Sequence, residues 1–317
     1  AEFRDFLVFY NPAATTANVT ITLYYENGFT TSFSQSIESN RRSGVNINND
    51  GRVPQNGRFG VKVESDQPIV AAQSSYNLLN GGGDGTLGDS DGGSIEGVTS
   101  SVSTGGGVSG RLAILNSGTE AATVTVTASY SRVDIPDLTR VIVVQPGRTF
   151  SQSLAQFGLT NGEVAGLRYT SNNPVTMNVI QYQNGDGDGT VTATRAATKW
   201  QFGDAFMNPR RAGITYIEDL TFFNPGSSTL DITVTFIFRN SAPSQSTTIS
   251  VSAGDFAFVS VDQQPIILGL TNSQPFSISV SGATPFVAFF THYDRFLNGG
   301  WTALGSPVGL ENDLSSI

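Results

Sequence analysis

The feature that most constrains this chain is a fixed spacing between an asparagine and a run of alternating apolar residues. Asn11, Asn116 and Asn224 each end a short apolar stretch, and apolar residues follow each of them at positions 8, 10, 12 and 14 later. A period of two is typical of a β-strand with one buried face. A slip of one residue would turn every apolar side chain to the other face, so the shared spacing indicates one strand order used three times.

A second spacing is centred on three prolines and leads to the same conclusion. Apolar residues stand 9, 7 and 5 positions before Pro68, Pro174 and Pro285, and a tyrosine stands 8 positions after each. These tyrosines are Tyr76, Tyr182 and Tyr293. Six or seven short strands in about a hundred residues are typical of a β-sandwich. We therefore expect an all-β chain of three tandem immunoglobulin-like β-sandwich repeats.

The expected repeats cover residues 1–93, 94–196 and 197–308, followed by a tail at 309–317. The glycine-rich stretch 81–110 is expected to be a flexible junction, within which 94–102 fits either the last strand of the first repeat or the first strand of the second. The aromatic residues of Lys199–Phe202 are expected to pack at a domain edge. Asn27-Gly28 predicts a type I′ hairpin turn, because both residues tolerate a positive φ.

Composition excludes several classes of function. Seventeen Lys and Arg against 26 Asp and Glu give 317 residues a formal charge of −9, which opposes binding to nucleic acid phosphates. The chain has no cysteine, which excludes thiolate chemistry and disulfides, and it has no apolar run of about twenty residues that could span a membrane. The first residue is not Met, from which we expect a processed or trimmed N-terminus and a location outside the cell or on its surface.

Catalytic side chains are sparse, and we do not expect an enzyme. His292 is the only histidine, and the repeat spacing aligns it with Ser75 and Gln181, so we expect a solvated strand residue rather than the base of a catalytic triad. Glu218-Asp219 directly precedes a strand, and nothing in the sequence indicates the apolar pocket that a protonated carboxyl of a glycosidase needs.

Two acidic, glycine-rich loops are the strongest chemical signal in the sequence. Asp186 and Asp188 alternate with glycine in one loop, and a second loop carries Asp84, Asp89 and Asp91. Carboxylates on a flexible backbone can turn toward one hard cation, so weak calcium binding is one hypothesis. The alternative is that both loops are exposed hairpin tips in which Asp and Gly satisfy turn geometry. No other cofactor is expected.

Aromatic residues near the strand ends offer a hypothesis for ligand binding. Tyr76, Tyr182, Tyr293 and Trp301 could form a platform on which sugars stack. The alternative is that the tyrosines, which share one repeat position, are core residues, because a buried ring contributes a large apolar area.

Four segments resemble a family of tandem domains of unknown function found in bacterial secreted and cell-surface proteins. They are the turns Asn11-Pro12 and Asn224-Pro225, the segment Ser65–Val70, and the segment Lys199–Asp204. The second repeat departs from the pattern, with Asn116-Ser117 and Ser171–Pro174 at the matching places. The resemblance implies a β-rich extracellular building block without catalytic residues.

These observations lead to two hypotheses on function. The first is a non-enzymatic structural or interaction protein at the cell surface or in a matrix, acting by spacing and by self-association through strand edges or contact with other surface proteins. The alternative is a glycan-binding module or adhesin, stiffened by calcium.

Overall fold

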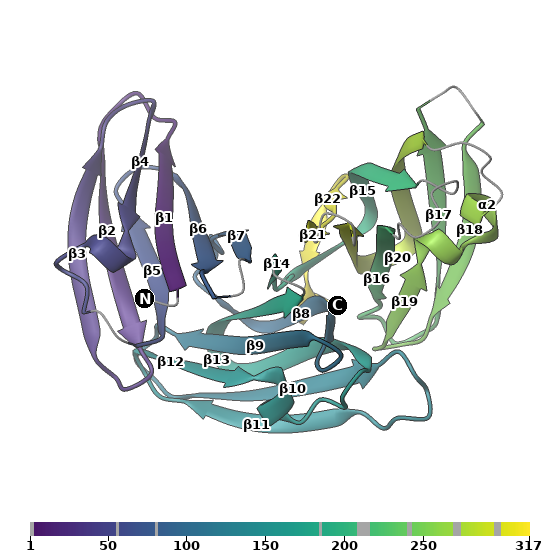
Figure 1. Ribbon diagram of the computed structural model, residues 1–317, viewed down its shortest axis with the longest axis horizontal. Coiled ribbons are helices and arrows are strands. Elements are labelled where there is room, and N and C mark those ends of the chain that lie inside the picture. The colour runs from purple at the N-terminus through teal and green to yellow at the C-terminus, as the bar shows by residue number, and fades with distance from the viewer. Residues whose placement is uncertain are drawn as a thin grey trace.

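The computed structural model describes residues 3–54, 57–79, 82–183, 186–207, 216–239, 243–268, 274–294 and 299–317 (Figure 1). Strands account for 67% of the structure and helices for 6%, so the expectation of an all-β chain is confirmed. The strands form antiparallel sheets arranged as three sandwich-like units, which we call the first, second and third unit. No helix in the described ranges has the length and apolar character needed to cross a membrane.

The first unit packs the sheet β4-β1-β6-β7 against the sheet β3-β2-β5. Its elements are β1 (Phe3–Asn11), β2 (Ala17–Tyr25), β3 (Thr30–Ile37), β4 (Arg41–Asn46), η1 (Ile47–Asn49), β5 (Phe59–Ser65), β6 (Val70–Asn77) and β7 (Gly83–Leu87). The alternating residues of β2 predicted to be apolar and buried, such as Ile21 and Leu23, lie in the core between the two sheets.

The second unit uses one long strand in both of its sheets. Its elements are β8 (Ser94–Ser103), β9 (Val108–Asn116), β10 (Ala122–Tyr130), β11 (Leu138–Val144), β12 (Arg148–Ser153), α1 (Leu154–Phe157), β13 (Val164–Gln183) and β14 (Asp186–Val191). The first half of β13 pairs with β10 and β8, and its second half pairs with β9 and β14. The two halves of β13 therefore take the places of β5 and β6.

The third unit repeats this pairing with β20 as the long strand. Its elements are β15 (Arg195–Met207), β16 (Tyr216–Phe223), β17 (Leu230–Phe238), β18 (Gln245–Val251), β19 (Phe256–Ser260), η2 (Val261–Gln263), α2 (Pro265–Leu268), β20 (Gln274–Asp294), β21 (Gly299–Leu304), β22 (Ser306–Pro307), β23 (Glu311–Asp313) and η3 (Leu314–Ser316). The first half of β20 pairs with β17 and β15, and its second half pairs with β16 and β21.

The asparagine that marks each unit in the sequence is a buried hydrogen-bonding centre. Asn11, Asn116 and Asn224 are all fully buried. In each, Nδ2 donates to the carbonyl four residues later and to the carbonyl of the last residue of another strand of the same unit, which is β3, β11 or β18 respectively, at 2.8–3.0 Å. Each Oδ1 accepts from the backbone N–H two residues later. The asparagine side chain makes all of these bonds, so the turn does not depend on the residue that follows it. This explains why Ser117 can replace the proline found in the other two units.

Several expectations about boundaries and turns need correction. The expected start of the second repeat at 94 is not among them, because residues 94–103 form β8 and pair with β13 of the second unit. Residues 309–317 are not a free tail, because β23 pairs with β15 and Leu314 is buried. Trp200 lies in the core of the third unit rather than at an edge, and its indole N–H donates to the Phe286 carbonyl at 2.8 Å.

The turn between β2 and β3 also differs from the expected type. Of the two residues Asn27 and Gly28, only Gly28 has a positive φ, of 85°, whereas a type I′ turn needs a positive φ at both. The Asn27 side chain instead accepts a hydrogen bond from the Phe29 N–H. This side-chain hydrogen bond stabilises the turn in place of a positive φ at Asn27.

Candidate functional site at the hairpin junction

The last hairpins of the three units meet at the centre of the molecule (Figure 1). β14 lies against β7 of the first unit on one side and against β21 of the third unit on the other. Within the hairpins, Gly83, Gly187 and Gly300 each pair with the tyrosine that follows the marker proline by eight residues. Asp84, Asp188 and Trp301, one residue further on, therefore occupy equivalent positions.

Carboxylates join each hairpin to the next. Asp84 Oδ1 accepts a hydrogen bond of 2.8 Å from the Gly189 N–H, and Asp188 Oδ2 accepts one of 2.5 Å from Thr302 Oγ1. Gly189 and Thr302 each directly follow the residue of their own hairpin that is equivalent to Asp84. The two bonds therefore join the same pair of hairpin positions in successive units. A further bond of 2.7 Å runs from the Gly300 N–H to Asp186 Oδ2.

Glycine is required where the hairpins approach each other. A Cβ on Gly82 would lie 2.6 Å from the Asp186 carbonyl carbon, and a Cβ on Gly189 would lie 2.0 Å from Asp84 Oδ2. The Asp186 backbone cannot easily move away from a Cβ on Gly82, and a Cβ on Gly189 would displace the Asp84 carboxylate from its hydrogen bond. Residues 82–87 of the glycine-rich stretch thus dock against β14. They are not part of a flexible junction, as composition had indicated.

Burial changes the acid–base behaviour of the junction carboxyls. Burial raises the pKa of Asp188 to about 6, and the hydrogen bonds from Thr302 offset only part of this effect. Burial also raises the pKa of Asp84, against the hydrogen bond from Gly189. Negative charges on the neighbouring aspartates act in the same direction. A proton is therefore held more tightly here than on an exposed aspartate.

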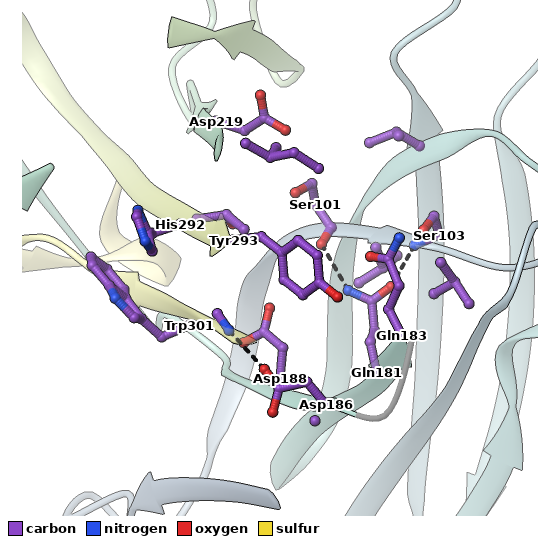
Figure 2. Close-up of a pocket in the computed structure, with 17 residues that line it drawn as sticks. Ser101, Ser103, Gln181, Gln183, Asp186, Asp188, Asp219, His292, Tyr293 and Trp301 are labelled. Atoms are coloured by element: carbon purple, nitrogen blue, oxygen red, sulfur yellow. Dashed lines mark hydrogen bonds between the residues drawn. The ribbon is translucent and has the colours of Figure 1, made fainter. Parts of the chain in front are cut away.

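Two cavities adjoin the junction. The larger, of about 210 Å³, lies between the second and third units and is lined by Gln181, Asp186, Asp188, Asp219, Tyr293 and Trp301, among others (Figure 2). Figure 2 shows the Tyr293 ring pointing into the middle of this cavity. The smaller, of about 130 Å³, lies where the three hairpins meet. The lining combines acidic, amide and aromatic groups.

His292 and Glu218 contradict their sequence-based interpretation. Glu218 is fully buried, and its Oε1 lies 2.8 Å from His292 Nδ1. The His292 ring stacks on Trp301, with 5.8 Å between ring centroids. Contact with the Glu218 carboxylate raises the pKa of His292, while burial raises the pKa of Glu218. The residue expected to be solvated is thus held between a buried acid and an indole ring.

The residues predicted to bind metal or ligand are only partly brought together. Asp84, Asp186 and Asp188 meet at the junction, whereas Asp89 and Asp91 are exposed and Asp91 pairs with Arg195 at 2.8 Å. Across the described ranges, no group of three or more His, Cys, Asp or Glu residues is placed to hold a metal ion.

The predicted aromatic platform is divided in a similar way. Tyr293 and Trp301 share the larger cavity. Tyr76 is 46% exposed and stands edge-on to Phe6, and Tyr182 lies beside Phe3. An Asn-Gly pair follows each of the three tyrosine-bearing strands in the sequence, and the structure does not describe Asn80, Gly81, Asn184, Gly185 and Asn298 of these pairs.

The second and third units share an apolar contact that the sequence did not reveal. Phe223, Phe256, Val287 and Phe289 of the third unit form one buried cluster with Val98 of the second. A Cβ on Gly166 would lie 2.5 Å from the Phe256 ring, so the ring packs directly on the backbone of β13. The continuous apolar run Phe286–Phe290 of β20 places apolar side chains on both faces of the strand, and it was the available signal for a sheet buried on both sides.

Comparison with known proteins gives a family but no activity. The sequence pattern of a family of unknown function, DUF5719, matches residues 1–262. The chain belongs to this family. No curated protein matches it. A structure titled "Crystal Structure of Thermotoga maritima 1070" is similar, with 24% identity and a TM-score of 0.31 over 35% of this chain and 95% of that one. The low TM-score supports no conclusion about function.

Proposed function

We propose that this protein is a non-enzymatic extracellular structural protein, in which three tandem immunoglobulin-like copies are held as one rigid body. The observation that carries the proposal is the pair of carboxylate bonds from Asp84 to Gly189 and from Asp188 to Thr302, which repeat one offset between successive units. Rigid, ordered modules suit a role in spacing and display. The acidic position is Trp301 in the third unit, so the series of carboxylate links ends there.

The surroundings of the acidic groups support a structural role over catalysis. Asp84, Asp186 and Asp188 each accept a hydrogen bond from a neighbouring hairpin, which orients their oxygens toward protein rather than toward a substrate. His292 is held by the buried Glu218. An extracellular location is consistent with the composition, since charged residues make up only 14% of the chain.

Removing a junction carboxylate tests the proposal. Asp84→Ala should leave Gly189 N–H without its partner and loosen the first unit relative to the second, seen as a broader distance distribution between spin labels on the two units. Asp89→Ala is the matched control, because Asp89 lies on the following exposed loop and accepts a hydrogen bond from the nearby Asp91 N–H. Equal distributions for the two variants and the wild type would refute a structural role for the junction.

Glycan binding is the second candidate function, and the larger cavity favours it. Amide, carboxylate and aromatic groups converge there, and these groups recognise sugar hydroxyls and ring faces. A glycan array should then show binding that is lost in Trp301→Ala and kept in Tyr76→Ala, since Tyr76 lies away from the cavity lining. Failure of every tested glycan to bind would remove this candidate.

Calcium binding by the acidic loops is also open to a direct test. A cation at Asp84, Asp186 and Asp188 would have to compete with the hydrogen bonds that these carboxylates accept. Calorimetric titration with calcium, and thermal unfolding with and without it, decide the matter. No heat of binding and no shift in the midpoint would exclude a calcium site.

A further inference from the structure

One sheet edge of the first unit differs from the equivalent edges of the other two. The first half of β13 is flanked by β10 and β8, and the first half of β20 is flanked by β17 and β15. The equivalent strand of the first unit is β5. Within the described residues, β5 pairs with β2 on one side and with no strand on the other, and at Gly60 it packs against Leu115 of β9 and Thr149 of β12.

The missing neighbour leaves the core of the first unit partly open. Leu167 and Tyr169 of β13, and Ile278 and Val280 of β20, are buried almost completely. The matching residues of β5, Val61 and Val63, are only partly buried, as is Phe59. An apolar row therefore lies along an unpaired backbone edge, an arrangement that favours addition of a further strand.

The other units show what kind of element completes this edge. β8 and β15 run antiparallel to the first halves of β13 and β20, and they place apolar side chains into the cores. Val102 on β8, and Trp200 and Phe202 on β15, are among these buried residues. The occupant of the β5 edge must likewise be an extended, antiparallel strand.

We propose that the β5 edge is a self-association surface, and that its occupant is β5 of a second copy of this chain. In an antiparallel pair centred on Val63, Lys62 of one copy faces Glu64 of the other, and the second such pair follows by symmetry. Lys62 and Glu64 already contact each other at 2.8 Å within one chain, so both lie on the same face of the sheet. The edge is thus complementary in charge to itself.

The pairing defines the form of the assembly. A twofold axis midway between the two Val63 residues joins β3-β2-β5 of each copy into one continuous six-stranded sheet. Such an interface uses the same surface on both copies, so it closes as a dimer and does not extend into a filament. The inference rests on the proposed structural function, whose self-association it makes specific.

Charge reversal tests the pairing without disturbing the core. Glu64→Lys and Lys62→Glu each replace the two facing opposite pairs with like pairs, and each should raise the dimer dissociation constant by about tenfold or more. The combined variant Lys62→Glu/Glu64→Lys restores opposite pairs and should restore the dimer. Sedimentation velocity over a range of concentrations gives these constants, and circular dichroism confirms folding.

A cysteine cross-link tests the register of the pair. The chain has no cysteine, so Val63→Cys gives each copy a single thiol at the proposed axis. Mild oxidation should give a covalent dimer, because residues facing each other across antiparallel strands can be close enough for a disulfide. Ser34→Cys, exposed on β3 at the other edge of the same sheet, is the control and should not cross-link.

The outcomes separate this inference from the proposed function. A wild-type chain that stays monomeric at all concentrations, or a dimer unaffected by both charge reversals, would overturn the β5 pairing. Equal cross-linking of Val63→Cys and Ser34→Cys would also overturn it. Neither result bears on the rigidity of the three units within one chain, which the Asp84→Ala distance measurement tests separately.

Discussion

The two junctions between units share the same carboxylate bond but differ in apolar burial. Between the second and third units, Phe223, Phe256 and Val98 take part in a buried cluster beside the bonds of Asp186 and Asp188. Between the first and second units, the contacts include the Asp84 bond, the bond from Thr149 Oγ1 to the Tyr24 carbonyl, and the contact of Phe3 with Tyr182.

The difference indicates two mechanical blocks within one molecule. Buried aromatic area stabilises a contact far more than single hydrogen bonds near a surface do. The second and third units should therefore unfold together, while the first unit should separate at lower cost. The repeated carboxylate bond then sets the orientation of the units, and the apolar cluster sets how strongly two of them are coupled.

Breaking the apolar cluster should have the largest effect. Phe256→Ala removes a ring that packs on Phe223, at 4.8 Å between centroids, and on the β13 backbone. We expect a loss of about 3–5 kcal/mol in the free energy of unfolding of the second and third units, measured by chemical denaturation. Phe29→Ala, at a ring 51% exposed in the first unit, should cost less than about 1 kcal/mol. Similar losses would mean that the cluster does not couple the units.

Removing a buried asparagine should show which units unfold together. Asn11→Ala and Asn224→Ala each leave buried backbone groups without partners, which should cost about 2–4 kcal/mol. Calorimetry should show that Asn11→Ala lowers only a transition of the first unit, whereas Asn224→Ala lowers a transition that the second and third units share. If either variant shifted all unfolding by the same amount, the molecule would be a single cooperative block.

A single methyl group should weaken the junction of the first and second units. In Gly82→Ala the new Cβ would meet the Asp186 backbone at 2.6 Å, which should cost about 1–3 kcal/mol. Gly85→Ala is the matched control on the same hairpin, because its Cβ would meet only ordinary contacts, with Ser74 Oγ at 3.8 Å. Equal stability of the two variants would show that the hairpins do not dock as described.

The smallest expected effect is a pH dependence. The folded-state pKa of Asp188, about 6, lies above its ordinary value of 3.8, so the folded protein binds the proton more tightly than the unfolded chain. The resulting stability is fully present below pH 3.8 and is lost as the pH rises through about 6. Asp188→Asn should flatten this part of the stability profile between pH 4 and 7. An unchanged profile would contradict burial of this carboxyl.

The sequence predicted the strands well because their signal is local. The offset from Asn11, Asn116 and Asn224 defined which residues face the core, and the observed register of β2, β10 and β17 agrees with it. The hydrogen-bonding role of the asparagine was not predicted, because its partners Ile37, Val144 and Val251 lie 26 to 28 positions further along the chain. Trp200 was misplaced for a related reason, because its partner Phe286 lies 86 positions away.

The site was predictable only in its parts. Asp84, Asp186 and Asp188 were identified as acids in glycine-rich loops, but their partners Gly189, Gly300 and Thr302 belong to other hairpins. Spacing along one loop cannot reveal a contact between hairpins about a hundred residues apart. The equivalence of Asp84, Asp188 and Trp301 in the repeat was the one signal that linked these hairpins. The burial of Glu218 likewise depends on the fold of the whole third unit.

Distances between spin labels test the central claim most directly, namely that the hairpin junction holds the three units in a fixed arrangement. Cysteines at exposed Ser34, Val141 and Gln245 label the first, second and third units in a chain without native cysteine. Double electron–electron resonance should give one narrow distribution for each neighbouring pair, and Asp84→Ala should broaden only the pair between the first and second units. A broad distribution in the wild-type protein, or no response to Asp84→Ala, would contradict the claim.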